Sequence, residues 1–314
     1  MHSLHVALAS LGMAACVTAT GPQGGDDTKN DDPTHLKVVK EIDVGGEADW
    51  MGIGFGSLWA PIPSGELLRI DPASLEIVAR IPVGAAPYRG VAIGSDAVYI
   101  PNAGDDTISK VDPTTNAVIA TFPTTLGGDS EGSIGVSGDS LWVVAGEGVL
   151  NRLDSSTGAV LSAAAIPTDA HGVVVDGGCV WVTSSANNAV AQIDVATGGT
   201  LNTIAIEPGP RFLTAGGGSV WVLSQGSGKV TRIDSGTGAV VATIDVHAPG
   251  PGGDISYGEG GVWVTTFGKP AGKIDETTNE LVMQFVEEGF GDAIRAGLGK
   301  LWISGPAIFA IAVP

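Results

Sequence analysis

One repeated unit constrains the fold of this chain more than any other feature. The unit is well preserved in the stretch Gly217-Gly218-Ser219-Val220-Trp221-Val222, and it recurs seven times at intervals of about 40 residues. The repeated aromatic residues are Trp59, Tyr99, Trp142, Trp181, Trp221, Trp263 and Trp302. A period of this length, built from short alternating segments between glycine-rich turns, is typical of four-stranded β-propeller blades and excludes helical solenoids.

Within one copy, alternation and turn residues predict four strands, at residues 211–215, 220–224, 230–234 and 240–246. The third strand ends in an apolar residue followed by aspartate, and a short turn follows. These aspartates are Asp71, Asp112, Asp154, Asp194, Asp234 and Asp275. An aspartate at the start of a turn accepts backbone N–H bonds, so we assign all six a structural role and no chemistry.

The predicted fold class is therefore all-β: a seven-bladed β-propeller with four antiparallel strands in each blade. Residues 36–44 match the fourth strand of the repeat, although no first three strands precede them. The C-terminal residues supply three strands and stop before a fourth. We expect the propeller to span 36–314, with blade 7 formed by 292–314 together with 36–45, because an open ring would expose unpaired strand edges.

The amino-acid composition argues against some classes of binding partner. The chain has 314 residues, 48 of them glycine, and a formal net charge of -19. Such acidity argues against nucleic acid and against an anionic membrane surface as partners. A closed ring of repeats also accommodates this length in one domain, and we expect a monomer.

The N-terminus resembles a bacterial lipoprotein signal. A short apolar stretch ends in Met13-Ala14-Ala15-Cys16, with small residues before the cysteine. The resemblance implies a signal peptide at 1–15, lipidation of Cys16 and an extracytoplasmic, membrane-anchored protein; a plain secretory signal, giving a secreted or periplasmic protein, is the alternative. Residues 16–35 are polar and aperiodic, which predicts a disordered tether.

Two family resemblances support the propeller. Tyr99-Ile100-Pro101-Asn102 and the run Ile-Asp-x-x-Thr-Gly-x-Val are similar to YVTN/YncE-type propeller repeats. The segment from His171 to Thr183 is also similar to repeats of streptogramin lyases and gluconolactonase-like propellers. These families share an architecture but no single activity, so function has to be argued from a site.

The loops that enter the first strand of each blade are expected to meet at one mouth of the central channel. Polar and aromatic residues gather in these loops, and the candidate ligand-binding residues are Trp50, Tyr88, Arg89, Arg211, Phe212 and Arg295. Arg295 stands where the other blades carry small or uncharged residues, so we expect it to pair with a nearby aspartate. The leading hypothesis is a non-enzymatic module that holds a small molecule or a protein segment at this mouth.

The alternative hypothesis is a lyase or lactonase at the same mouth. Streptogramin lyases use a histidine base with acidic neighbours and magnesium, and the resemblance implies His171, Asp169 and Glu131 as the catalytic residues. Independently, Asp49, Asp254 and Asp292 lie on consecutive blades and offer oxygen ligands to calcium or magnesium. No other cofactor is indicated.

Overall fold

The computed structural model describes residues 34–87, 90–126, 131–146, 148–247, 250, 252–266, 269–287 and 291–314, with the main chain alone at 269–270. The described residues belong to one compact unit. The described part contains strands and turns but no helix. It accordingly contains no helix with the length and apolar character needed to cross a membrane.

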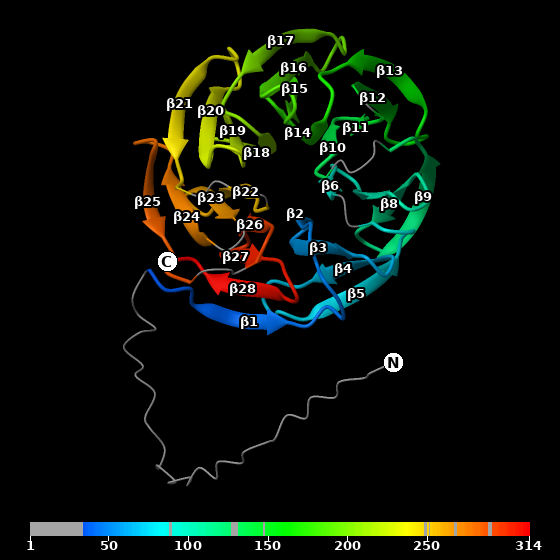
Figure 1. Ribbon diagram of the computed structural model, residues 1–314. Coiled ribbons are helices and arrows are strands. Elements are labelled where there is room, and N and C mark those ends of the chain that lie inside the picture. The colour runs from blue at the N-terminus through cyan, green and yellow to red at the C-terminus, as the bar shows by residue number, and fades with distance from the viewer. Residues whose placement is uncertain are drawn as a thin grey trace, which may run out of the picture. The chain divides into compact units, whose positions relative to one another are not determined.

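Seven four-stranded antiparallel sheets stand around a central axis (Figure 1). Blade 1 comprises β2 (Gly52–Gly54), β3 (Ser57–Ile62), β4 (Glu66–Ile70) and β5 (Ile77–Pro82). Blade 2 comprises β6 (Ala92–Ile93), β7 (Val98–Asn102), β8 (Thr107–Asp112) and β9 (Ala117–Pro123). Blade 3 comprises β10 (Ile134–Ser137), β11 (Ser140–Val144), β12 (Val149–Asp154) and β13 (Val160–Ala165).

Blade 4 comprises β14 (Ala170–Asp176), β15 (Cys179–Ser184), β16 (Ala189–Asp194) and β17 (Thr200–Ala205). Blade 5 comprises β18 (Pro210–Gly216), β19 (Ser219–Ser224), β20 (Lys229–Asp234) and β21 (Val240–Asp245). Blade 6 comprises β22 (Ile255–Gly258), β23 (Gly261–Thr266), β24 (Lys269–Asp275) and β25 (Glu280–Gln284). Blade 7 comprises β26 (Ile294–Gly297), β27 (Lys300–Ile303), β28 (Ile308–Ala312) and β1 (Val38–Ile42). The all-β, seven-bladed prediction is confirmed, and in blade 5 the predicted strand ends differ from the observed ones by one residue at most.

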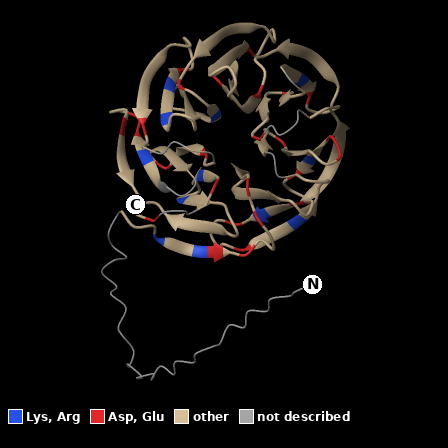
Figure 2. Cartoon of the chain, viewed as in Figure 1, with Lys and Arg blue, Asp and Glu red and all other residues tan. Residues whose placement is uncertain are grey.

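The predicted turn aspartates also behave as expected. Each of the six accepts a backbone N–H from its own turn, for example the N–H of Thr237 at 2.8 Å from Asp234 Oδ1. Hydrogen bonds from the turn residues hold the pKa of all six carboxyls below its usual value. These bonds favour the charged form and explain why an acidic chain can place so many carboxylates in its loops (Figure 2).

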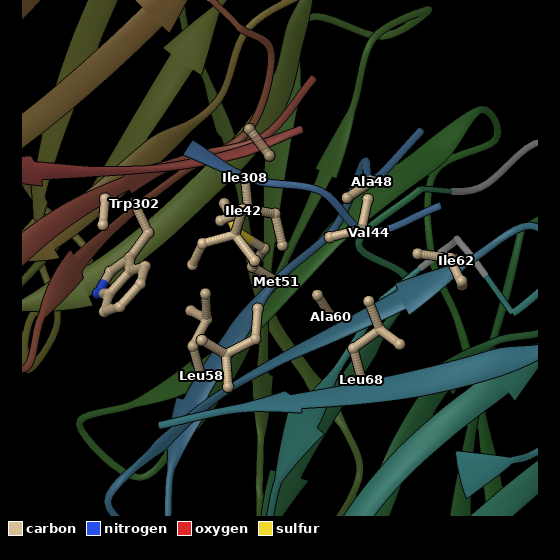
Figure 3. Packing of buried hydrophobic residues seen from close by; sticks show 13 residues of the cluster. Ile42, Val44, Ala48, Met51, Leu58, Ala60, Ile62, Leu68, Trp302 and Ile308 are labelled. Atoms are coloured by element: carbon tan, nitrogen blue, oxygen red, sulfur yellow. The ribbon is translucent and has the colours of Figure 1, made fainter. Parts of the chain in front are cut away.

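The N-terminal strand closes the ring. β1 pairs antiparallel with β28, so strands from the two ends of the described chain lie side by side (Figure 1). Ile42 and Val44 pack with Ile308, Met51 and Leu58 at the joint between blades 7 and 1 (Figure 3). This burial explains why the last blade needs the N-terminal segment.

The closing strand does not bury all of its apolar side chains. Val38 and Val39 are 42% and 50% exposed. They lie on the outermost strand, where one sheet edge and much of the side-chain surface face solvent. The closing strand is therefore stabilised by its backbone pairing and by Ile42 and Val44, which are 4% and 0% exposed.

Deleting residues 1–45 should destabilise blade 7 although that blade lies at the opposite end of the sequence. The deletion removes the partner of β28 and two buried side chains, each contributing roughly 1.5–3 kcal/mol, so the melting temperature should fall by about 5 °C or more. Deletion of residues 1–32 is the matched control and should leave it within about 2 °C. Calorimetry on both truncations provides the measurement, and equal melting temperatures would contradict closure by β1.

A cation stacks on the repeated aromatic residue in five of the seven blades. The cation precedes the apolar–Asp pair and faces the aromatic across the second and third strands of the blade: Arg69 on Trp59, Lys110 on Tyr99, Arg152 on Trp142, Arg232 on Trp221 and Lys273 on Trp263. The distances from the cationic centre to the ring centroid are 4.6 to 5.5 Å. We call this arrangement the cation–aromatic stack.

The arginine stacks also tie neighbouring blades together. Arg232 donates from Nε to Ser219 Oγ at 2.9 Å, within its own blade. The Nη1 of Arg232 donates to Asn279 Oδ1 at 2.8 Å, in the β24–β25 turn of the next blade. Arg69 makes the corresponding bonds to Ser57 and Asn116. A guanidinium suits this position because its fixed fork reaches both partners at once.

Blade 4 replaces the stack by a neutral pair. Gln192 faces Trp181, and its Nε2 lies 3.3 Å from the Cys179 sulfur, which occupies the position of Ser219 in blade 5. Cys179 is a free thiol and is buried. Cys179 therefore fills a buried position that a small residue, Ser219, occupies in blade 5.

Replacing Arg232 by alanine should lower the free energy of unfolding by about 2–4 kcal/mol, from lost charge-assisted hydrogen bonds and cation–π attraction. Arg232→Lys should recover only part of this, since an ammonium cannot span Ser219 and Asn279 together. Lys40→Ala, which removes an exposed ion pair of 3.5 Å with Glu76, is the control and should cost less than about 1 kcal/mol. Denaturant titrations compare the three variants, and similar losses in Arg232→Ala and Lys40→Ala would refute the role of the stack.

Candidate functional site at the channel mouth

A pocket lies at one mouth of the central channel, where the loops that enter the inner strands converge. Its volume is about 210 Å³. Five blades contribute its lining residues, which are Asp49, Trp50, Glu131, Arg211, Phe212, Gln225, Gly252, Gly253, Asp254, Asp292 and Ala293. We call this cavity the mouth pocket. Seven of these residues are candidates from the sequence, and they come together as the repeat register implies: Asp49, Trp50, Glu131, Arg211, Phe212, Asp254 and Asp292.

Trp50 forms a wall of the mouth pocket and is itself mostly buried, at 8% exposure. It packs edge-to-face against Phe212 of blade 5, with ring centroids 5.3 Å apart. On another side it approaches Gly132 of blade 3, where a Cβ would lie 2.9 Å from the end of the indole. The indole of blade 1 therefore reaches across the channel, and the glycine leaves room for it.

Arg295 pairs with Asp254, as the sequence led us to expect. The guanidinium contacts the Asp254 carboxylate and also donates from Nε to Met51 O at 2.7 Å. The Asp254 side chain is only 4% exposed, and the second oxygen accepts the backbone N–H of Ile255. Arg295 also stacks on Trp50 at 5.2 Å. A buried pair with this many partners fixes the pocket wall, since each charge is compensated.

A second ion pair spans the channel. Arg211 of blade 5 donates to Glu131 of blade 3, with Nη2 2.8 Å from Oε2, and both side chains are 30% exposed. Arg211 also lies 5.4 Å from the Phe212 ring. Arg211 and Glu131 both line the mouth pocket, and so do Asp49, Asp254 and Asp292.

Asp49 and Asp292 contact each other. Their side chains are hydrogen-bonded, and Asp292 also accepts the backbone N–H of Gly253 at 2.8 Å. Burial and the neighbouring Asp292 and Glu131 charges raise the pKa of Asp49 from 3.8 to about 8. Burial likewise raises the pKa of Asp292. At neutral pH the two carboxyls therefore share a proton.

The predicted metal site has the three aspartates in one place but no metal-binding arrangement. Among the residues that the structure describes, no group of three or more histidine, cysteine or acidic side chains is placed to hold a metal ion. Asp254 is engaged by Arg295, which leaves Asp49 and Asp292 with each other. A calcium or magnesium site stays a prediction.

The three predicted catalytic residues are divided between two separate ion pairs. His171 Nε2 lies 3.2 Å from Asp169 Oδ1, whereas Glu131 pairs with Arg211. Burial, followed by the Arg211 charge, lowers the pKa of His171, so its imidazole is neutral at pH 7. His171 is 8% exposed and is not among the residues that line the mouth pocket.

Three of the candidate residues lie outside the described part of the chain: Tyr88, Arg89 and Cys16. The lining residues missed from sequence are Gln225, Gly252, Gly253 and Ala293. Gln225 follows β19 and donates from Nε2 to Gly252 O at 2.8 Å. The loop that follows the second strand of each blade also faces the mouth. A comparison of the residues in these loops would therefore have identified Gln225.

The shared proton of Asp49 and Asp292 predicts a pH dependence. The folded chain keeps a proton that the unfolded Asp49, with its ordinary pKa of 3.8, has already lost. Retention of this proton therefore stabilises the folded state fully below about pH 4, and this stabilisation is lost as pH rises through about 8. Between pH 6.5 and 8 the free energy of unfolding should fall by up to about 1.4 kcal/mol per pH unit.

Asp49→Asn should flatten this slope, because an amide does not titrate. Asp139→Asn, an exposed aspartate in the β10–β11 turn, is the control and should retain the slope. Denaturant unfolding at intervals from pH 6.5 to 9 gives the comparison. The same slope in both variants would contradict the shared proton.

Comparison with known families adds a second line of evidence. A family model described as outer membrane protein assembly factor BamB matches residues 104–270, just over half of the chain. The chain belongs to this family. The match runs from the loop after β7 to the start of β24, so it covers all of blades 3 to 5, β8 and β9 of blade 2, and β22 and β23 of blade 6. A search of curated proteins finds no match.

Proposed function

We propose that this protein is a binding module that holds a small ligand or a protein segment in the mouth pocket. The observation that carries the proposal is the mouth pocket itself: a concave site where five blades bring an aromatic wall together with charged and amide side chains. Concave sites of this mixed chemistry are the usual ligand sites of proteins. The lining residues are also held by contacts with one another, such as Arg211–Glu131 and Trp50–Phe212, so a bound group would meet partners that are already positioned.

Membership of the BamB family supports a protein segment as one form of the ligand. The family description names an assembly factor of the outer membrane, and assembly factors work by contacting other proteins. On this proposal the mouth pocket anchors one side chain of the segment, and the surrounding loops contact the rest. The lipid anchor on Cys16 and the extracytoplasmic location belong to the same proposal, supported by the signal-like stretch and by the family description.

Fluorine NMR on the full chain labelled with 5-fluorotryptophan tests the proposal. The chain has seven tryptophans, and only Trp50 lines the mouth pocket. Trp50→Phe identifies its resonance. Some members of a panel of cationic, neutral and anionic fragments should shift the Trp50 resonance and leave the six repeat tryptophans unchanged.

A matched pair of variants checks the location. Arg211→Ala alters the pocket wall and should change the dissociation constant of such fragments by about fivefold or more, in the sense set by their charge. Lys229→Ala removes an ion pair of similar exposure, Lys229–Glu207 at 3.2 Å, whose residues do not line the mouth pocket, and it should leave fragment binding unchanged. A panel without any fragment that shifts Trp50, or equal effects of the two variants, would overturn the proposal.

The lyase or lactonase activity stays a prediction with one observation in its favour. A carboxylate oriented toward a histidine, as Asp169 is toward His171, is the arrangement that a general base requires. The histidine does not line the mouth pocket, however, and binding accounts for more of the described residues there. Turnover of cyclic depsipeptides or lactones, with and without EDTA, is the direct assay.

A further inference from the structure

Among the described residues, Arg211 lines the mouth pocket and Arg295 stacks on its Trp50 wall, and each of these arginines is already neutralised. Arg211 pairs with Glu131, and Arg295 pairs with Asp254. Both guanidiniums also lie against aromatic rings, which fixes their positions further. Neither arginine is therefore available to neutralise another carboxyl without breaking an existing pair.

Asp49 and Asp292 are the two carboxyls that remain. Among the described residues, no basic side chain forms an ion pair with either of them, and they contact each other. Their neighbours Asp254 and Glu131 are also acidic, so the local charge stays negative after both arginine pairs are counted. Two carboxyls held together in this way leave a place where a positive charge would be strongly favoured.

A third acceptor faces the same cavity and is independent of the acidic residues. Gln225 lines the mouth pocket and is 9% exposed. Its Nε2 is used by Gly252 O, whereas its Oε1 accepts no hydrogen bond from any residue in the described ranges. An amide oxygen of a pocket-lining residue without a protein donor can accept a hydrogen bond from an N–H or O–H group of a bound ligand.

We infer that the mouth pocket receives one cationic nitrogen group, an alkylammonium or a guanidinium, between Asp49, Asp292 and Gln225. This inference rests on the proposed binding function and names its ligand chemistry. A nitrogen cation supplies several N–H donors to the three acceptors, and Trp50 supplies an aromatic wall of the kind that attracts cations. A calcium ion would need six to eight oxygen ligands, which the described side chains do not provide.

The size of the mouth pocket limits what enters it. Its 210 Å³ is smaller than the roughly 300–1,000 Å³ of sites that enclose drug-sized molecules. It therefore admits a small amine or the end of a lysine or arginine side chain, with the rest of any larger partner outside. Free amine and protein side chain offer the same chemistry, and the test separates them.

The test uses the Trp50 fluorine resonance of the full chain with propylguanidinium, its neutral isostere propylurea, and propionate. A blocked tripeptide with a central arginine, compared with its central citrulline analogue, represents a protein segment. Propylguanidinium and the arginine peptide should both shift Trp50, and propylurea, propionate and the citrulline peptide should bind at least about tenfold more weakly. Tighter binding of the peptide than of propylguanidinium identifies a protein segment as the source.

Two variants locate the charge. Asp292→Asn and Asp49→Asn should each weaken propylguanidinium binding about tenfold or more, and Asp139→Asn, with the same change of charge on an exposed turn, should not. Asparagine keeps an oxygen acceptor for the Gly253 N–H, and the six repeat tryptophan resonances report whether each variant stays folded.

The remaining outcomes overturn the inference. If propylurea or propionate binds as well as propylguanidinium, the cation inference is wrong while the binding function stands. If no probe shifts Trp50, both are wrong. If propylguanidinium binds only after Arg89→Ala, the chain supplies this cation itself, and the inference is again wrong.

Discussion

The cation–aromatic stack is the interaction on which the rest of this ring depends. A propeller blade can pair its own strands, but it needs a partner for each of its two faces. In blade 5 the guanidinium of Arg232 covers the Trp221 ring, bonds to Ser219 in the same blade and reaches the β24–β25 turn of blade 6. One side chain thus couples the interior of one blade to the turn geometry of the next. Because the turn is itself held by its aspartate, the stacks and the turns stabilise each other around the ring.

The fold was predictable because several independent features of the sequence recur in each repeat and indicate the same structure. Alternation, turn aspartates and the aromatic position each gave the same blade boundaries, and the incomplete ends at β1 and β28 implied closure. The stack was also visible, since Arg69, Arg152 and Arg232 each precede an apolar–Asp pair. It was missed because a cation on a strand is usually solvated, and only the register places it over the ring.

The mouth pocket was predictable only in part. The repeat register places one loop of every blade at the mouth, and it brought Asp49, Arg211, Asp254 and Asp292 together. It does not determine which way a loop side chain turns. The reach of Trp50 across the channel to Gly132, the pairing of Glu131 with Arg211 and the contribution of Gln225 all depend on packing between blades that are distant in sequence.

The repeat and the site also have opposite energetic characters. At repeated positions the stacked arginines have hydrogen-bond partners, as in the Arg232 network. At the mouth, Asp49 and Asp292 are brought together by the ring against their mutual repulsion and retain a proton. Such an arrangement costs stability, and it persists only where the surrounding structure determines the positions. The closure of the ring by β1 and the five cation–aromatic stacks offset that loss of stability. We therefore interpret the Asp49–Asp292 pair as a site that is preorganised to bind a cation.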